Sequence, residues 1–407
     1  MKIRQYNMEF GDCFLFTEPG EEDSCLLVDC GSKVINSCGN VINDIHRDIS
    51  RYKKKEALIT HFHQDHIDGL TELTKKGIAF HKVYVPNIFE CAYPGYVTVD
   101  LLEGILSLGG IRSKDLTVDR IPLIRFLRMI TASGAPIELL DRSKDFSFGK
   151  TNMEVLWPAV HMLPVQQEWD RIERMLIDAG MDVFVTLQSA AERVCAIVLN
   201  RQEGDSTTLG EIEEDILRLI QQTEGISPDL RNRIRARLHK MAHEYNIVFQ
   251  GNESDRGVLF TGDINAKELR RIAENSVMPQ KPLYKKYFIY KAPHHGTGEP
   301  HYFHFAPYFA SDYVAVTNGN AQRKYGKISF DYNNRTAVGI SGYEMKCTNT
   351  NGARCESFQK TGGCVNCDYC NIGRYKNYID LMQGRGTRDG ATGTVLLSCK
   401  EDISWII

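Results

Sequence analysis

Long apolar runs are missing from the 407-residue chain, and no stretch approaches the ~18 apolar residues of a membrane span. The opening segment also lacks the pattern of a signal peptide, because Glu9, Gly11 and Asp12 interrupt its apolar residues. Internal repeats and low-complexity segments are absent as well. These absences favour a cytoplasmic globular protein without a membrane segment.

Net charge is also scarce, since 49 Lys and Arg residues face 52 Asp and Glu residues, which gives −3. A general polyanion binder carries a large positive excess, so contact with nucleic acid must come from a local basic patch. Three basic groups could contact phosphate, although a solvated surface is the commoner role of such runs. They are Arg231, Arg233, Arg235, Arg237 and Lys240; Lys281, Lys285 and Lys286; and Arg374, Lys376, Arg385 and Arg388.

Short apolar segments bounded by Gly, Pro or polar residues predict the strands of this chain. Between the early and the late strands, about residues 164–245 show helical patterns, including a basic helix that begins near Ser227 and Pro228. Strands at both ends with helices between them favour a layered α/β fold. The predicted strands are 25–30, 56–60, 152–157, 246–250, 257–261, 287–292, 312–317 and 393–398.

Residues 60–66, THFHQDH, directly follow a predicted strand. His61 and His63 are two residues apart, so they point the same way from an extended loop. Asp65 and His66 come next and can face a second point. Three imidazoles and a carboxylate are costly to bury as core, whereas they suit Zn²⁺, which binds nitrogen and oxygen donors. The motif therefore predicts a metal site.

Two later segments place matching side chains just past predicted strands. Asp263 ends the segment LFTGD, and His294 and His295 lie in the segment PHHG. Each segment alone is typical of an ordinary loop. Together with the first motif they predict a dinuclear site, in which Asp263 could bridge two metals.

These motifs, taken in order, resemble the metallo-β-lactamase superfamily. More narrowly, they resemble the hydrolase domain of the competence DNA-uptake proteins (ComEC type) and its free-standing relatives. The resemblance spans about residues 1–320, with a large gap from roughly 80 to 245, and implies an αββα sandwich with a two-zinc site on one edge. The matching pieces are residues 8–12 (MEFGD), 26–31 (LLVDCG), 60–70, 257–263 and 291–296 (KAPHHG).

The resemblance also implies a role for each residue of the metal motif. Water bound to zinc has a pKa near 7, so hydroxide is present at neutral pH, and Asp65 would orient this nucleophile. No serine or cysteine nucleophile is then needed. The implied assignment is His61 and His63 on the first zinc, Asp65 and His66 on the second, and Asp263 bridging the two.

Two ligand positions of the superfamily stay open in this sequence. The last histidine ligand is one of His294 and His295. We favour His295 as the ligand, with His294 facing the substrate as a phosphate contact or proton donor. The third histidine position is assigned to His243, which precedes a predicted strand, and His161 and Asn246 are the alternatives.

The competence-like resemblance implies hydrolysis of a phosphodiester in nucleic acid or a nucleotide. Zinc is the expected metal because the flavodi-iron relatives have an acid where this chain has His63; manganese or iron are alternatives at the catalytic site. One competing function is a small-molecule ester, thioester or lactam hydrolase of the same superfamily. The other is a metal-stapled nucleic-acid- or protein-binding module with little turnover, against which the complete ligand set argues. Protein partners and oligomeric state stay open.

Twelve cysteines are present, and five of them fall between Cys347 and Cys370. In a reducing compartment such clustering favours metal over disulfides. Four thiolates suffice for one structural zinc, although free thiols or a redox pair are the alternative. The expected ligands are Cys355, Cys364, Cys367 and Cys370, with Cys347 as the alternate.

These patterns divide the chain into three parts. The first, residues 1–340, is the hydrolase domain with its helical insertion at about 164–245. A cysteine-rich zinc knuckle occupies residues 341–375, and residues 376–407 close the sandwich. The knuckle interrupts what resembles the final strand pair of the family, at residues 343–348 and 393–397.

Replacing both Cys364 and Cys367 by serine should destabilise the chain and release one metal equivalent. The reason is that two remaining thiolates cannot complete a tetrahedral zinc site. Metal content per chain and the thermal midpoint measure the two effects, with Cys195→Ser as the control. Unchanged metal content would remove the knuckle from consideration.

Overall fold

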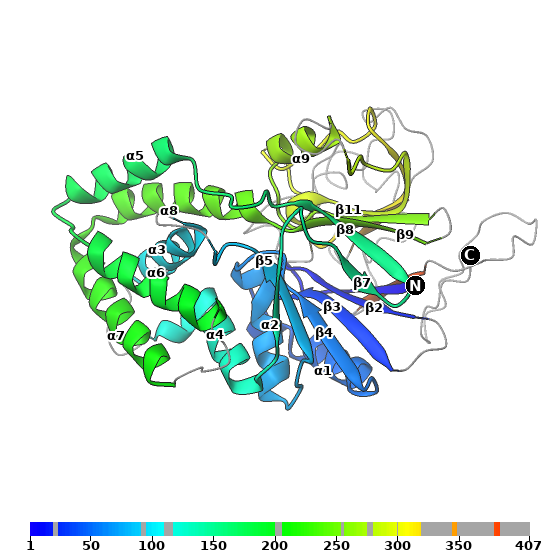
Figure 1. Ribbon diagram of the computed structural model, residues 1–407, viewed down its shortest axis with the longest axis horizontal. Helices are drawn as coiled ribbons and strands as arrows, with labels where there is room; N and C mark the ends of the chain where they lie inside the picture. The colour runs from blue at the N-terminus through cyan, green and yellow to red at the C-terminus, as the bar shows by residue number, and fades with distance from the viewer. Residues whose placement is uncertain are drawn as a thin grey trace, which may run out of the picture.

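The computed structural model describes residues 1–318, except 19–22, 91–94, 110–116, 200–205, 254–255, 275–279 and 299, and the strands Glu344–Cys347 and Tyr378–Met382. The described residues form two sheets that pack face to face, with helices on their outer faces (Figure 1). The expected αββα sandwich is therefore confirmed. None of the described helices is both long and apolar enough to cross a membrane.

The first sheet has the strand order β14-β1-β2-β3-β4-β5-β6. Strands β3 to β6 run parallel, whereas β14, β1, β2 and β3 are joined by antiparallel pairs. The strands are β1 Lys2–Tyr6, β2 Cys13–Thr17, β3 Ser24–Cys30, β4 Lys54–Leu58, β5 Lys82–Pro86, β6 Ile137–Leu140 and β14 Tyr378–Met382.

The second sheet has the strand order β13-β12-β11-β10-β9-β8-β7. Strands β10 to β13 run parallel, and β7 to β10 are joined by antiparallel pairs. The strands are β7 Phe146–Phe148, β8 Thr151–Trp157, β9 Val248–Glu253, β10 Arg256–Phe260, β11 Lys286–Lys291, β12 Ala310–Val316 and β13 Glu344–Cys347.

Aromatic side chains fill the space between the two sheets. Phe14 and Phe16 of β2 each contact Phe260 of β10, with ring centroids 5.0 and 5.1 Å apart. Phe249 of β9 stacks on the other side of this group, 5.3 Å from Phe260. All four rings are buried, and each removes a large apolar area from water. This layer fixes the distance between the two sheets whose ends carry the polar motifs.

Helices cover the outer faces of both sheets. Helices α1 (Gly39–Ser50) and α2 (Gln64–Lys75) pack on the first sheet, and α4 (Pro122–Ser133) packs against α2. On the second sheet, α9 (Ala266–Ala273) buries Leu269 and Ile272 in a cluster that includes Tyr287 and Tyr290 of β11. Each helix thus hides one apolar face, as expected for a layered fold.

The expected helical insertion is present as four helices: α5 (Gln166–Ile177), α6 (Phe184–Leu199), α7 (Ser206–Gln222) and α8 (Pro228–Ala242). Ser227 caps α8 by accepting a hydrogen bond from the Leu230 amide, at 3.3 Å. The insertion packs on α3 (Tyr96–Leu108) and shares one apolar core with the helices of the first sheet. Helix α8 runs from this lobe toward the sandwich (Figure 1).

Some elements differ from the sequence-based expectations. The strands β1, β2, β5, β6, β7 and β14 were not predicted, and β6 and β7 are only four and three residues long. The end of the chain was expected to supply a strand pair, but β13 joins β12 in the second sheet and β14 joins β1 in the first. Residues 393–398, the cysteines 355, 364, 367 and 370, and the basic residues 374–388 lie outside the described residues.

Candidate metal centre

The loop after β4 delivers the first motif to the edge of the sandwich. β4 ends at Leu58, and α2 begins at Gln64, directly after His63. His61 and His63 turn toward each other, with His61 Nε2 2.9 Å from His63 Nδ1. Asp65 and His66 lie in the first turn of α2, and all four side chains are buried.

Three histidines form the first group of candidate ligands. His61, His63 and His243 place one nitrogen each within 4.8 Å of one another. His243 is buried in the short 3₁₀ turn that follows α8, and its Nε2 has no hydrogen-bond partner. An unpartnered buried nitrogen beside two other imidazoles suits a metal ligand, because buried polar atoms are nearly always satisfied. The donor set therefore fits a zinc ion.

The structure distinguishes among the three alternatives for the third histidine. His243 joins His61 and His63, whereas His161 is exposed in a turn after β8 and joins no ligand group of the described residues. Asn246 is buried, but its side chain forms hydrogen bonds with the backbone and is not part of a ligand group. Its Nδ2 donates to the His243 carbonyl at 3.0 Å, and its Oδ1 accepts from the Asp263 amide at 2.8 Å. Asn246 thus ties together the two backbone segments that carry His243 and Asp263.

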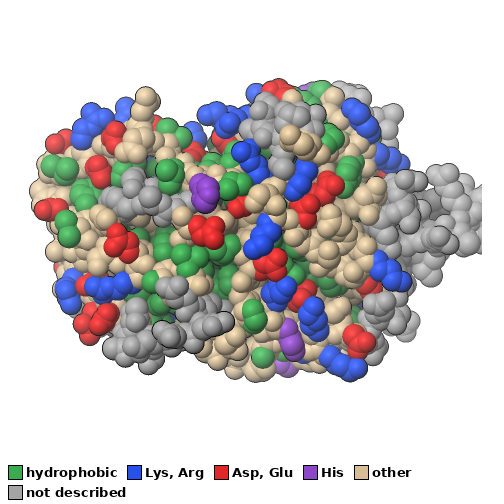
Figure 2. Space-filling view, in the orientation of Figure 1, with side chains coloured by type: hydrophobic (Ala, Val, Ile, Leu, Met, Phe, Trp, Pro, Cys, Tyr) green, Lys and Arg blue, Asp and Glu red, His purple; other side chains and the backbone are tan. Residues whose placement is uncertain are grey.

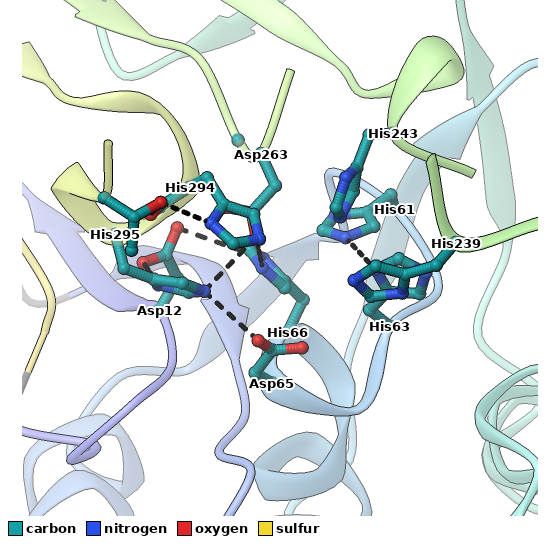
Figure 3. Close-up of polar contacts among 12 residues, drawn as sticks. Asp12, His61, His63, Asp65, His66, His239, His243, Asp263, His294 and His295 are labelled. Atoms are coloured by element: carbon teal, nitrogen blue, oxygen red, sulfur yellow. Dashed lines mark hydrogen bonds and ion pairs between the residues drawn. The ribbon is translucent and has the colours of Figure 1, made fainter. Parts of the chain in front are cut away.

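Two carboxylates and two histidines form the second group: Asp65, His66, Asp263 and His295. Asp263 Oδ2 lies 3.2 Å from both His66 Nε2 and His295 Nε2. His295 Nε2 also lies 3.1 Å from Asp65 Oδ2. Figure 3 shows this group beside the three histidines of the first group. Residues that follow β4, β10 and β11 therefore meet at one edge of the sandwich.

His294 and His295 have different surroundings although they are neighbours in the chain. His295 is fully buried in the second group, whereas the His294 side chain is 15% exposed and its Nε2 lies 3.9 Å from Asp263 Oδ2. Both residues have positive φ angles, which turn the two rings in different directions. His294 bonds Thr297 Oγ1 through Nδ1 at 2.6 Å and stacks on His301 at 3.8 Å. His294 therefore lies at the rim of the centre.

Carboxylates lie behind three of the imidazoles and orient them. Asp29 Oδ2 is 2.9 Å from His66 Nδ1, and Asp12 Oδ1 is 3.0 Å from His295 Nδ1. Glu103 Oε2 is 3.2 Å from His63 Nε2. In each case the carboxylate binds the nitrogen that faces away from the ligand group, so the other nitrogen points into it. Carboxylate–histidine pairs of this kind fix the ring and increase its basicity toward a metal.

The sequence analysis did not assign these supporting roles. Asp12 and Asp29 were noted only as parts of family-like motifs; Asp12 directly precedes β2, and Asp29 lies in β3. His239, whose ring stacks on His63 at 4.3 Å, was one of the two nearest candidates for the third histidine ligand, but its place beside His63 was not predicted. Glu103 carried no signal because it lies in an ordinary helix. Only the packing of α3 and α8 beside the loop brings them there.

Burial keeps the histidines of the first group neutral. Desolvation lowers the pKa of His61 and His243 well below the usual value and that of His63 to about 4. The neutral imidazole is the form that binds a metal ion, so these groups need not release protons first. The burial of three neutral nitrogens in one place thus prepares the group for a cation.

The second group is held in a charged form. Burial opposes ionisation, yet the Lys33 ammonium, 2.9 Å from Asp65 Oδ1, holds the pKa of Asp65 well below its usual value. For Asp263 the burial effect is likewise outweighed, here chiefly by His295 and His66, and its pKa also falls well below the usual value. Against its own burial, the pKa of His66 rises to about 10 because Asp263 and Asp29 flank it. A divalent cation would take the place of the His66 proton.

Glycines allow the backbone segments to approach closely at this edge. A Cβ on Gly31 would lie 2.3 Å from the His66 amide nitrogen, so only glycine fits between β3 and the start of α2. The neighbouring Asp12 amide donates to the Asp65 carbonyl at 3.0 Å. Gly262 has a φ of 51°, and a Cβ there would lie 2.4 Å from Asn246 Oδ1. These contacts set the position of both ligand groups.

Of the eight described basic residues that could contact phosphate, five have other partners. Arg231 is buried and donates to the carbonyls of Thr223 and Ile226, at 3.2 and 3.1 Å, so its guanidinium is used within the fold. Figure 2 shows positive and negative side chains interspersed over the described part of the visible face. The paired residues are Arg233 with Asp229, Arg237 with Glu168, Lys281 with Asp145, and Lys286 with Asp312.

A family model described as "Anti-Pycsar protein Apyc1" matches residues 7–92, the part that carries Asp12, Asp29 and the first metal motif. Among solved structures, the metallo-β-lactamase fold protein YhfI from Bacillus subtilis matches at 10% identity, with a TM-score of 0.36, over 85% of this chain and 95% of that chain. A comparison with curated proteins gives no match.

The decisive observation is the two-sheet sandwich with the His-x-His-x-Asp-His motif, Asp263 and His295 gathered at one edge. The described residues thus form an αββα sandwich of the kind that the resemblance to the metallo-β-lactamase superfamily implies. Within this fold the sequence-predicted residues His61, His63, Asp65, His66, His243, Asp263 and His295 all lie in the two ligand groups. The donor atoms of these groups suit metal ions.

Gly31→Ala should displace the start of α2 and disturb both ligand groups. The added methyl group would overlap the backbone of residues 64–66, and overpacking of this kind costs about 1–3 kcal/mol of unfolding free energy. Chemical denaturation and metal content per chain measure the change. Gly39→Ala is the matched control, because nothing lies within 4 Å of a Cβ there. Equal stability and equal metal content of the two variants would contradict the role given to Gly31.

Proposed function

We propose that this protein is a dizinc phosphodiesterase that acts on nucleic acid or a nucleotide. The observation that supports the proposal is the pair of adjoining ligand groups, one of three neutral histidines and one of two carboxylates and two histidines. Such nitrogen and oxygen donor sets suit zinc, and two-metal centres are well suited to phosphoryl chemistry. The phosphodiester class follows from the competence-like motifs. Manganese or iron are the other metals to test.

The ligand groups give each residue a role in this proposal. His61, His63 and His243 would hold one ion, and Asp65, His66, Asp263 and His295 would hold the other, with Asp263 as the bridge. When bound, the two ions would supply Lewis acidity toward water and the phosphoryl oxygens. The imidazoles need no movement for this, because Glu103, Asp29 and Asp12 already hold three of them in place.

Asp65 and His294 are the proposed catalytic side chains. Asp65 has one oxygen beside His295 and the other beside Lys33, so its carboxylate is fixed and ionised where it can orient attacking water. His294 lies at the rim, where a substrate can reach its partly exposed ring. Thr297 and the stacked His301 hold that ring from two directions. His294 can therefore contact a phosphate oxygen or pass a proton to the leaving group.

Metal content and a substrate panel test the proposed function directly. Zinc, iron and manganese per chain are quantified, and turnover is measured with bis-p-nitrophenyl phosphate, cyclic dinucleotides, RNA, single- and double-stranded DNA and a thioester. Zinc at the centre with phosphodiester cleavage is expected. Cleavage of the thioester alone would replace the proposal with a small-molecule hydrolase. Binding of nucleic acid or a protein without turnover would replace it with a binding module.

The double substitution His63→Ala with Asp65→Ala removes one ligand from each group. We expect metal-dependent turnover to fall by more than about 100-fold, because loss of even an outer partner of a metal ligand costs 10- to 100-fold. Circular dichroism should show a folded chain. His161→Ala is the control, since this histidine is exposed and belongs to neither ligand group. Retained activity in the double variant would reject the centre.

A further inference from the structure

A small cavity lies beside the first ligand group, between the metal loop and the helical lobe. Its volume is about 110 Å³, and His63 and Glu103 form part of its wall. Water occupies about 30 Å³ per molecule in the liquid, so the cavity suits a group of a few heavy atoms and excludes a duplex. The other walls come from Lys33, from α3, from Arg120 before α4, and from Arg235 on α8.

The cavity is lined by three cations: Lys33, Arg120 and Arg235. Lys33 has a partner, since its ammonium lies 2.9 Å from Asp65 Oδ1. Arg120 and Arg235 have no ion-pair partner among the residues that the structure describes. The Nε atom of Arg235 is also buried and lacks a hydrogen-bond partner. A half-buried guanidinium with a buried donor that makes no hydrogen bond is unfavourable, unless an anion accepts that hydrogen bond and balances the charge.

The acidic side chains that line the cavity do not supply the anion for Arg120 and Arg235. Glu103 is already shared between His63 at 3.2 Å and His239 at 2.9 Å. Asp100 accepts a hydrogen bond from Tyr245 at 2.6 Å, and burial raises its pKa well above the usual value. Among the described residues, neither carboxylate forms a hydrogen bond or an ion pair with Arg120 or Arg235. The positive charge of Arg120 and Arg235 thus remains available to a ligand.

Arg235 is singled out by comparison with its neighbours on α8. Arg231 is buried against backbone carbonyls, Arg233 pairs with Asp229 at 3.5 Å, and Arg237 pairs with Glu168 at 2.6 Å. Arg235 lies one helical turn before His239, whose ring stacks on His63. Among these four arginines, Arg235 alone lines the cavity that touches the metal loop.

The position of the cavity relative to His63 shows what an anion there would do. His63 Nδ1 faces His61 and the first ligand group, whereas Nε2 faces Glu103, which lines the cavity. A ligand in the cavity would therefore lie next to the metal centre, separated from it by the His63 ring. We propose that Arg235, Arg120 and Lys33 form a subsite for a second phosphate of the substrate, distinct from the phosphate that is cleaved.

This inference rests on the proposed function and makes its substrate class narrower. A substrate would be a phosphodiester that carries a further phosphate, such as a phosphorylated nucleotide or the phosphorylated end of a single strand. Arginine suits this role because its planar fork binds two phosphate oxygens at once. The helical insertion would then select the substrate while the sandwich holds the metals.

Two chromogenic substrates that differ only by a 3′-phosphate test the subsite. Thymidine 5′-(p-nitrophenyl phosphate) and its 3′-phosphorylated form share the bond to be cleaved and the leaving group. We expect kcat/KM to be at least about tenfold higher for the phosphorylated form, and Arg235→Gln to remove most of this preference through KM. Arg235→Lys should restore part of it, because the charge returns without the bidentate fork. Arg233→Gln is the matched control and should keep the full preference.

A binding measurement separates failure of the subsite from failure of the proposed function. Calorimetry compares adenosine 3′,5′-bisphosphate with adenosine 5′-monophosphate on the zinc-loaded wild type, Arg235→Gln and Arg233→Gln. Tighter binding of the bisphosphate that Arg235→Gln alone abolishes would support the subsite even if no phosphodiester were cleaved. Equal affinities in all three proteins, together with equal kcat/KM values for the two chromogenic substrates, would overturn the subsite whatever the turnover.

Discussion

The compensation of buried charge at one edge of the sandwich governs the arrangement of the whole site. Asp12, Asp29, Asp65 and Asp263 are each at most 2% exposed. An isolated buried carboxylate is strongly unfavourable, so each must meet a cation or a proton-bearing ring. Lys291 forms an ion pair with Asp12, and Lys33 forms one with Asp65. The imidazoles of His66 and His295 contact the carboxylates of Asp29, Asp263 and Asp12. Segments from both sheets must therefore arrive together for any one of these residues to be tolerated.

Backbone contacts give this arrangement its accuracy. Gly31 lies against the backbone of residues 64–66, and Asn246 connects the His243 carbonyl with the Asp263 amide. Tyr245 donates to Asp100 and accepts from the Phe62 amide, which attaches the metal loop to α3. Small displacements of the ligands at a metal centre reduce activity, and these contacts restrict such displacements. The fold thus sets ligand positions through main-chain contacts as much as through side chains.

Helix α8 joins the helical insertion to the centre. Its last turn leads into His243, His239 stacks on His63, and Arg235 lines the neighbouring cavity. One helix therefore contributes to the first ligand group and to the surface that a substrate would meet. The sandwich supplies the remaining ligands from loops at its strand ends. In this division the insertion is an integral part of the site, since it shares its apolar core with the helices of the first sheet.

Sequence patterns were sufficient to predict the layered fold and most residues of the two ligand groups. Apolar segments with a sharp stop at His61, Asp263 and His294 carry a local signal, because side chains just past buried strands collect at one edge. Local patterns could not place the short strands β6 and β7. They also could not decide between His294 and His295, because only the contacts of the folded chain distinguish the two rings. They could not reveal Glu103 either, because its role depends on how α3 packs beside the loop. The partners of Arg231 and Arg237 come from segments up to 122 residues away. Packing was therefore needed to show that Arg235 has no ion-pair partner among the described residues. Ligand motifs are local and visible in sequence, whereas the use of a charged side chain depends on distant segments that only the folded chain brings near.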